Sequence, residues 1–273
     1  MAKLLGLNVD PFREPPDHTP DQLTGIGCCD VRLVLRPGML AMLDAYQDAG
    51  INVLGVIAKE SLERDGHPLG TWSEMAAFYQ ALYGARVKWW QIGNEPDSVG
   101  ESSWTMTHQE QDDLVRAFGA CWPQVGAGLA SGDPTKAWYY SAPVAIHYPQ
   151  SAIKVREYKQ HTTMPIWITE GFHDEAIIRS CLSEAEAYLA WWHSPTPDLG
   201  IFGHDDRIAT YTRLAAEFSG AEGGEIPMPE FVLGFKTYAA AHLEVGDPVE
   251  DEWTERWTPG TVQRQDTTAG VLR

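Results

Sequence analysis

Short apolar runs rich in Val, Ile and Leu alternate along the chain with segments whose apolar residues recur at helical spacing. This alternation is typical of a parallel sheet covered by helices, because each parallel strand is reached through a crossover helix. Strands are predicted at 4–9, 31–35, 51–57, 87–92, 125–130, 138–146, 165–169 and 199–202. Helices are predicted at 37–50, 72–83, 108–122, 176–192, 207–218 and 229–242. Eight strands with helices between them in 273 residues predict an α/β fold, a closed (β/α)₈ barrel.

The barrel is expected to be a single domain over residues 1–246, followed at 247–273 by a polar tail that packs on it or trails from it. No internal repeat, low-complexity tract or linker-like stretch in the sequence marks a second domain. The alternative fold is an open, doubly wound sheet, which needs a glycine-rich nucleotide loop after an early strand. Gly25-Ile26-Gly27 is too short a match to that loop, so the barrel is favoured.

Charge and hydropathy exclude two classes of partner. The formal net charge of −18 repels phosphate backbones and anionic lipid headgroups, so neither nucleic acid nor a membrane is expected as a partner. No segment of the sequence approaches the ~20 apolar residues that cross a bilayer. The first residues lack the apolar region of a secretory leader, so a cytoplasmic location is expected unless a leader has been removed. We expect a monomer or a weak homo-oligomer.

The cysteines Cys28, Cys29, Cys121 and Cys181 do not have the spacing of a zinc site and are expected to be free thiols. No metal and no cofactor are predicted. The chain also has 11 Trp residues, and indole rings stack well on the C–H faces of sugars. Three of these residues lie in or near predicted strand-to-helix loops and are candidate sugar platforms: Trp72, Trp104 and Trp138.

In a parallel barrel the active site lies at the carboxyl ends of the strands, so polar residues that directly follow an apolar run are functional candidates. Seven of the predicted strands end in this way. The residues are Asn8 and Asp10, Arg36, Lys59 and Glu60, Asn94 and Glu95, His147 and Tyr148, Glu170, and His204 and Asp205.

Two glutamates, Glu95 and Glu170, each follow a strand rich in Trp and Ile. Their spacing fits three strand-helix units, which places the fourth and seventh strands across the barrel mouth from one another. Cleavage of a glycosidic bond needs one protonated carboxyl to donate to the leaving oxygen and one carboxylate to attack the anomeric carbon. In retaining enzymes the two groups lie ~5–5.5 Å apart, where their mutual repulsion keeps one of them protonated. The pair predicts a retaining glycoside hydrolase.

Four segments together resemble the clan A glycoside hydrolases, also called the 4/7 superfamily. They are Val31-Arg32-Leu33, Ile92-Gly93-Asn94-Glu95-Pro96, His147-Tyr148 and Ile166-Trp167-Ile168-Thr169-Glu170, and they span most of the predicted barrel. The resemblance implies a TIM barrel that cleaves a β-linked glycoside or glycan by double displacement. It implies Glu95 as the acid/base, Glu170 as the nucleophile and Asn94 as the group that hydrogen-bonds the sugar 2-hydroxyl.

The resemblance also implies that His147 and Tyr148 line the site and orient the sugar and Glu170. Arg32 is implied as the second-strand arginine that keeps the nucleophile ionised. Arg36 lies on the same face of that strand by period-two counting and is closer to its end, so both arginines stay candidates. Asn8, at the end of the first strand, is a further substrate-binding candidate.

One departure from the family concerns the eighth strand, where clan A enzymes usually carry a Trp that forms the floor of the sugar site. The predicted eighth strand ends in Phe202-Gly203-His204 instead. Either Phe202 or His204 replaces that floor, or the strand lies elsewhere.

Two other functions remain open. A metal-dependent barrel hydrolase would use His147, His204, Asp205 and Glu170 as ligands, but these residues lack the spacing of a known zinc motif. A barrel that binds carbohydrate without turnover would follow if the altered eighth strand abolished catalysis.

Overall fold

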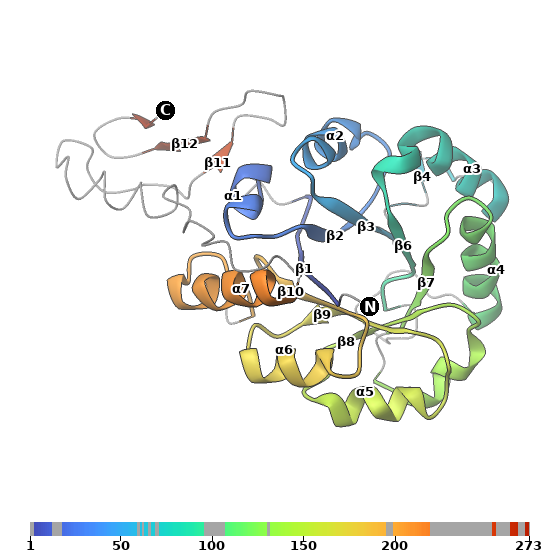
Figure 1. Ribbon diagram of the computed structural model, residues 1–273. Helices are drawn as coiled ribbons and strands as arrows, with labels where there is room; N and C mark the ends of the chain where they lie inside the picture. Colours follow the sequence, from blue (N-terminus) through green and yellow to red (C-terminus); the bar gives the residue numbers. More distant parts are fainter. Residues whose placement is uncertain are drawn as a thin grey trace.

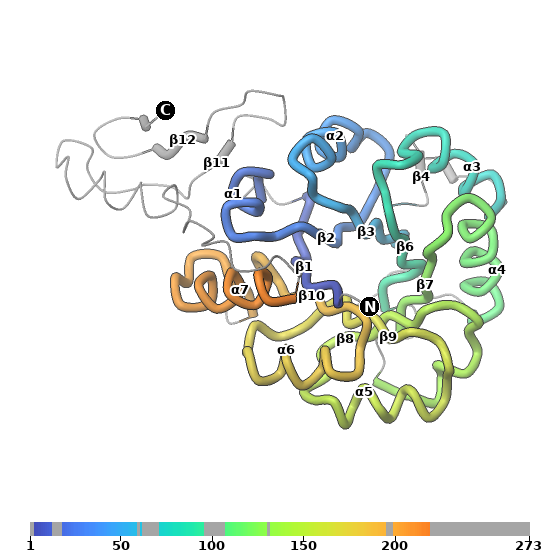
Figure 2. Tube along the Cα trace, viewed as in Figure 1, coloured from blue at the N-terminus to red at the C-terminus, as the bar shows by residue number. Residues whose placement is uncertain are grey.

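The computed structural model describes residues 3–12, 18–58, 61, 71–95, 107–129, 132–194 and 199–218, together with the backbone of a few short strands outside these ranges. Eight parallel strands close into a barrel in which each strand pairs with its neighbours in chain order and β10 pairs with β1 (Figures 1 and 2). The barrel strands are β1 (Leu4–Asn8), β2 (Asp30–Val34), β3 (Asn52–Ile57), β6 (Trp89–Ile92), β7 (Val125–Gly128), β8 (Val144–His147), β9 (Ile166–Gly171) and β10 (Ala187–Trp191). The predicted (β/α)₈ barrel is confirmed.

Helices surround the barrel on the outside (Figure 1). They are α1 (Pro20–Gly25), α2 (Leu40–Asp48), α3 (Trp72–Tyr83), α4 (His108–Gly119), α5 (Ala152–Lys159), α6 (Glu175–Leu182) and α7 (Asp205–Phe218), with 3₁₀ turns η2 (Gly84–Arg86) and η3 (Pro134–Tyr139). Thr71 and Thr107 begin α3 and α4 with capping boxes, in which the threonine and the glutamate three residues later satisfy each other's backbone N–H groups. No helix among the described residues has both the length and the hydropathy needed to cross a bilayer.

The large core lies between the strands and the helices. Trp90 of β6 shows how it forms, because its fully buried indole packs against Phe118 and Trp122 with ring-centroid distances of 5.0 and 4.9 Å. A smaller apolar cluster fills the barrel interior and contains Leu54, Val56, Ala58, Ala145, Trp167 and Ala187. The strands are therefore buried on both faces, as parallel strands usually are.

The predicted eighth strand at 199–202 was wrong. The strand is β10, which pairs in parallel with β1 from Leu4–Ala187 to Asn8–Trp191, and α6 ends at Leu182 rather than continuing to 192. Ala187–Trp191 has no polar residue, so its pattern fits a buried strand as well as a buried helix. Residues 199–202 contribute only an isolated bridge between Gly200 and Trp191.

The predicted strand at 138–146 was too long. Its first two residues belong to η3, and β8 begins at Val144.

The predicted helix at 229–242 and the proposed boundary after residue 246 lie outside the described residues. Within 247–273 the backbone describes β11 (Trp253–Thr254), β12 (Gln263–Asp266) and β13 (Val271–Leu272), which form an antiparallel sheet. A hairpin of β4 (Glu63–Arg64) and β5 (His67–Pro68) follows β3.

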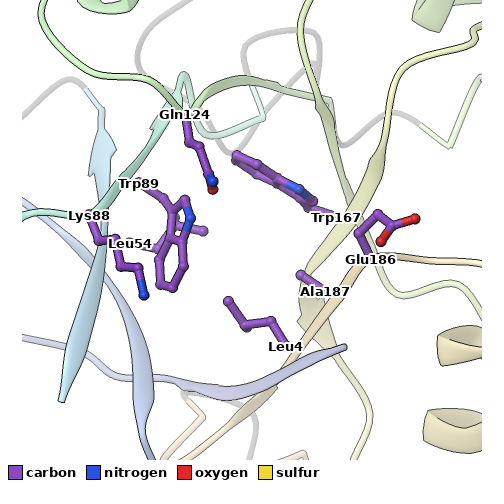
Figure 3. A pocket seen from close by; sticks show the side chains of 8 residues that line it. All are labelled: Leu4, Leu54, Lys88, Trp89, Gln124, Trp167, Glu186 and Ala187. Atoms are coloured by element: carbon purple, nitrogen blue, oxygen red, sulfur yellow. The ribbon is translucent and has the colours of Figure 1, made fainter. Parts of the chain in front are cut away.

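A cavity of about 300 Å³ lies at the amino ends of the barrel strands (Figure 3). Trp89 and Trp167 form part of its wall, and Leu4 and Ala187, which begin β1 and β10, line it as well. Active sites of this fold lie at the opposite, carboxyl ends of the strands. This cavity is therefore separate from the polar side chains described next.

Candidate active site

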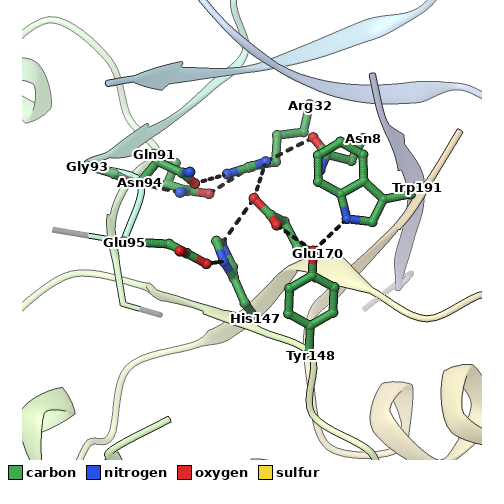
Figure 4. A network of polar contacts seen from close by, with 10 residues as sticks. All are labelled: Asn8, Arg32, Gln91, Gly93, Asn94, Glu95, His147, Tyr148, Glu170 and Trp191. Carbon is green, nitrogen blue, oxygen red and sulfur yellow. Dashed lines mark hydrogen bonds and ion pairs between the residues drawn. The ribbon is translucent and has the colours of Figure 1, made fainter. Parts of the chain in front are cut away.

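A connected group of polar side chains occupies the carboxyl ends of the barrel strands (Figure 4). Its members come from six strands or from the residues that directly follow them: Asn8, Arg32, Gln91, Asn94, Glu95, His147, Tyr148, Glu170 and Trp191. Asn8, Arg32, Gln91 and Glu170 are all buried. Burial of so many polar groups is costly unless they satisfy one another, so their contacts identify the candidate site.

A bulge in β9 directs Glu170 toward the barrel axis. Ile168 of β9 pairs with Ile146 of β8, and the next pair joins Glu170 to His147. Thr169 is therefore an extra residue on β9, and a register shift also occurs on the other side of this strand, against β10. A bulge of this kind re-aims the side chain that follows it.

Glu170 is surrounded by groups that favour its ionised form. Its Oε1 lies 3.0 Å from Nη1 of Arg32 and 3.6 Å from Nε2 of His147, and its Oε2 accepts a 2.8 Å hydrogen bond from the Tyr148 hydroxyl. Burial by itself raises the pKa of Glu170, but the electrostatic interactions with His147 and Arg32 and the hydrogen bonds from Tyr148 and Arg32 outweigh it. The pKa of Glu170 therefore lies below its usual range, and the side chain is a carboxylate at neutral pH.

Glu95 lies on a strained turn. It follows Gly93 (φ 81°) and has φ 54° itself; Tyr148 (φ 49°) is the other non-glycine residue with positive φ in the described part of the chain. Such a conformation costs on the order of 1–3 kcal/mol and persists only where the surroundings enforce it. The turn brings Oε1 of Glu95 within 2.8 Å of Nδ1 of His147.

The two carboxylates lie close together at the barrel mouth, and the His147 ring contacts both of them (Figure 4). One oxygen of Glu95, one oxygen of Glu170 and one ring nitrogen of His147 all lie within 4.8 Å of one another. These atoms could also hold a cation. The guanidinium of Arg32 already contacts Glu170, however, and its positive charge opposes a metal ion there.

Arg32 holds the network together through all three of its nitrogens. Nε donates to Oε1 of Gln91 at 3.1 Å, Nη1 to Oδ1 of Asn8 at 2.8 Å, and Nη2 to Oδ1 of Asn94 at 2.5 Å. Gln91 in turn donates from Nε2 to the carbonyl oxygen of Gly93 at 2.8 Å. The last residue of β7, Gly128, leaves room for this arrangement because it has no Cβ. A Cβ at this position would collide with the carbonyl oxygen of Gly93.

Trp191 completes the site from β10. Its Nε1 donates a 2.8 Å hydrogen bond to the hydroxyl of Tyr148, which donates to Glu170. Burial and the charge of Glu170 raise the pKa of Tyr148, so this hydroxyl stays protonated. Trp191 ends the strand that the prediction misplaced, and it supplies the tryptophan that the resemblance leads one to expect at the end of the eighth strand.

Three predicted binding residues lie outside this network. Arg36 is exposed, with its guanidinium 4.2 Å from the centre of the Phe12 ring, so of the two candidate arginines Arg32 is the one in the site. Phe202 packs against Trp192, which belongs to the core outside the barrel. His204 is exposed just before α7. The misplaced strand explains why the sequence pattern put Phe202 and His204 at the end of the eighth strand.

The four ligands that the metal-dependent alternative would need are not brought together. His204 and the neighbouring Asp205 are exposed, whereas His147 and Glu170 belong to the network in the barrel mouth. Sequence reasoning missed Gln91 and Trp191. Gln91 is a polar residue inside an apolar strand, and that pattern was the available signal.

No family model and no curated protein matches the chain. Several solved glycoside hydrolases share its fold. A β-D-glucuronidase from Dictyoglomus thermophilum aligns with a TM-score of 0.52 at 13% identity over 79% of this chain and 50% of that one. An endo-β-1,3-glucanase from Sorangium cellulosum aligns with a TM-score of 0.53 at 14% identity over 77% and 97%. A β-1,4-mannanase aligns with a TM-score of 0.52 at 10% identity over 78% and 99%.

The chain spans about half the length of the glucuronidase and nearly the whole of the glucanase and the mannanase. At these identities the likeness establishes the barrel fold, which glycoside hydrolases of several specificities use. Any assignment of activity must come from the side chains at the strand ends.

Proposed function

We propose that the chain is a retaining glycoside hydrolase of the clan A type, which cleaves β-linked glycosides or glycans by double displacement. The observation that carries the proposal is the pair Glu95 and Glu170, whose oxygens lie within 4.8 Å in two different surroundings. Arg32 and Tyr148 stabilise the ionised form of Glu170. Glu95 has no arginine contact among the described residues and is held by His147. This separation fits the short spacing of retaining enzymes rather than the ~6.5–9.5 Å of inverting ones.

In the first step, an oxygen of Glu170 attacks the anomeric carbon while the bond to the leaving oxygen breaks, and Glu95 gives its proton to that oxygen. In the second step, Glu95 takes a proton from water, the water oxygen attacks the anomeric carbon, and Glu170 leaves as a carboxylate. Each step inverts the anomeric carbon, so the product keeps the configuration of the substrate. His147 orients Glu95 through its 2.8 Å contact.

The neighbouring amides supply contacts to the sugar. Oδ1 of Asn94 accepts from Arg32, which orients the Asn94 Nδ2 as a donor for the sugar 2-hydroxyl. Nδ2 of Asn8 is buried and has no hydrogen-bond partner among the residues that the structure describes, so it offers a second donor. Trp191 provides an indole at the floor of the site, fixed through its hydrogen bond to Tyr148.

The test is hydrolysis of a panel of aryl β-glycosides and plant and microbial β-glycans, with the first-formed anomer identified by NMR. We expect the β-anomer to appear first and the α-anomer only later, by mutarotation. The α-anomer as first product would contradict double displacement. Binding without any hydrolysis would support the carbohydrate-binding alternative, and loss of activity with a chelator would support the metal-dependent one.

Gln91 joins the two halves of this proposed site. It is fully buried, accepts from Arg32 beside the nucleophile, and donates to Gly93, two residues before the acid/base. We expect Gln91→Leu to loosen Arg32 and so raise the pKa of Glu170. Hydrolysis needs ionised Glu170, and kcat/KM follows the ionisation of the free enzyme. The acid limb of kcat/KM for an aryl β-glycoside should therefore move to higher pH, which a profile over roughly pH 3–8 measures.

Gln111 is a matched control for this substitution. It is also buried, and its Nε2 donates to the carbonyls of Ile92 and Gly128 at the ends of β6 and β7. Among the described residues, the hydrogen bonds of Gln111 reach Ile92, Gly128 and Tyr140, but neither Arg32 nor Gly93. Both leucine variants should lose about 1–3 kcal/mol of stability, because each leaves buried polar groups unsatisfied, but only Gln91→Leu should move the acid limb. If the acid limb of kcat/KM lies at the same pH in both variants, Gln91 is merely structural.

A further inference from the structure

Two adjacent aromatic side chains, Trp138 and Tyr139, are exposed on η3. Trp138 is 68% exposed and Tyr139 is 52% exposed, and their ring centroids lie 5.4 Å apart. We call this pair the aromatic platform. Other large exposed apolar residues of the described chain, Leu40 and Ile153, are not next to another one in sequence. Scattered single apolar residues are normal on a surface, whereas adjacent exposed aromatic rings indicate a binding surface.

One side of the aromatic platform packs against the first residue of α4, His108. The imidazole of His108 stacks on the Tyr139 ring at a centroid distance of 4.4 Å and an interplanar angle of 12°. Nδ1 of His108 lies 2.7 Å from the hydroxyl of Tyr140, the next residue along the chain. One face of Tyr139 is therefore covered, and its position is fixed by the first turn of α4.

A chain of hydrogen bonds connects the platform to the carboxyl ends of the strands. The hydroxyl of Tyr140 donates to Oε1 of Gln111. Nε2 of Gln111 donates to the carbonyls of Ile92 and Gly128, the last residues of β6 and β7. His108 begins the helix that follows β6, and Glu95 lies three residues beyond the end of β6. The platform thus belongs to the same end of the barrel as the candidate site, on the side of Glu95.

We infer that the aromatic platform binds the leaving-group part of an extended, uncharged β-glycan, so that the substrate is an oligosaccharide or polysaccharide rather than a short glycoside. This inference rests on the proposed function. Glu95 protonates the leaving oxygen, so the leaving part of the chain extends from the side of Glu95. Open indole and phenol faces stack on the C–H faces of sugar rings. The net charge of −18 disfavours polyanionic glycans.

The test compares Trp138→Ala with the wild-type chain on a soluble neutral β-glycan and on an aryl β-glycoside. The ratio of kcat/KM for the glycan to kcat/KM for the aryl glycoside should fall roughly five- to tenfold, the effect of about 1–1.4 kcal/mol of lost ring contact. Trp138→Phe, which keeps an aromatic face, should recover most of the ratio. Ile153→Ala is the matched control, because Ile153 is 64% exposed but is not part of the platform, and it should keep the wild-type ratio.

Either of two kinetic outcomes would overturn the inference: an unchanged ratio in Trp138→Ala, or an equal fall of the ratio in Ile153→Ala. Retardation of each variant in gels containing the same β-glycan gives a readout that does not need catalysis. Weaker retardation of Trp138→Ala, with that of Ile153→Ala unchanged, is expected. If the wild-type chain cleaves nothing, the proposed function fails, while the gels still decide whether the platform binds glycan; equal retardation of all variants would then overturn it as well.

Discussion

Replacing Glu170 by Gln is expected to lower kcat/KM for β-glycosides on the order of 10⁴-fold, the scale seen when a group essential to covalent catalysis is disabled. An amide is nearly the same size but is a far weaker nucleophile, so the glycosyl-enzyme does not form. The substitution also leaves the buried guanidinium of Arg32 without its counter-charge, 3.0 Å away, and the variant should unfold at a lower temperature. Assays below that temperature separate lost chemistry from lost folding.

Glu175→Gln is the matched control for this loss. Glu175 contacts Arg179 and Arg213 on the outer surface of the barrel, so its substitution also removes a carboxylate from arginine partners. It should retain wild-type kcat/KM.

A further variant, Glu170→Gly, leaves space on the side of the nucleophile, and azide entering there should yield the α-glycosyl azide from an activated β-glycoside. Full activity in Glu170→Gln would refute the mechanism.

Replacing Glu95 by Gly is expected to separate substrates by their leaving groups. A dinitrophenyl glycoside needs no proton to depart, so its first step should be little affected. Glycosides with poor leaving groups should lose 10²–10⁴-fold in kcat/KM, because general acid catalysis typically supplies a factor of about this size. The variant also lacks the base that activates water in the second step. With the dinitrophenyl glycoside as substrate, the glycosyl-enzyme should therefore accumulate, and a burst of dinitrophenol in stopped-flow measurements would report it.

Glycine suits this position because residue 95 has φ 54°, so the variant should fold at least as stably as the parent. Azide should restore turnover by attacking the glycosyl-enzyme from the side of residue 95, which yields the β-glycosyl azide. The α-glycosyl azide from Glu170→Gly and the β-glycosyl azide from Glu95→Gly would identify the nucleophile and the acid/base independently. An equal loss on all leaving groups would contradict the role of Glu95 as acid.

The sequence carried enough information to predict the barrel, because seven of its strands are short apolar runs separated by turns or amphipathic helices. It did not define the eighth. Ala187–Trp191 is apolar on every side, and only pairing with β1, a contact between the two ends of the barrel sequence, decides that it is a strand. Local patterns contain no information about such a distant contact.

The site was predictable where a polar residue follows a strand and less so where it lies within one. Glu95 and Glu170 were found by their place at strand ends, and the structure brings their oxygens together. Gln91 lies inside β6 and was read as part of an apolar run, although its polarity in that run was informative. Trp191 was lost with the strand that carries it. The choice between Arg32 and Arg36 needed coordinates, because period-two counting along the sequence assigns both to the same face, whereas the structure places Arg32 beside Glu170 and Arg36 over the Phe12 ring.

The left-handed backbone at Glu95 and Tyr148 bears on how this chain could change over time. Asparagine or glycine would occupy either position at lower conformational energy than the residue present. Mutational drift that improves thermal resistance would therefore tend to remove the proposed acid/base, Glu95, and Tyr148, which donates a hydrogen bond to Glu170. On the proposed function, the requirement for turnover retains a glutamate and a tyrosine at these two strained positions.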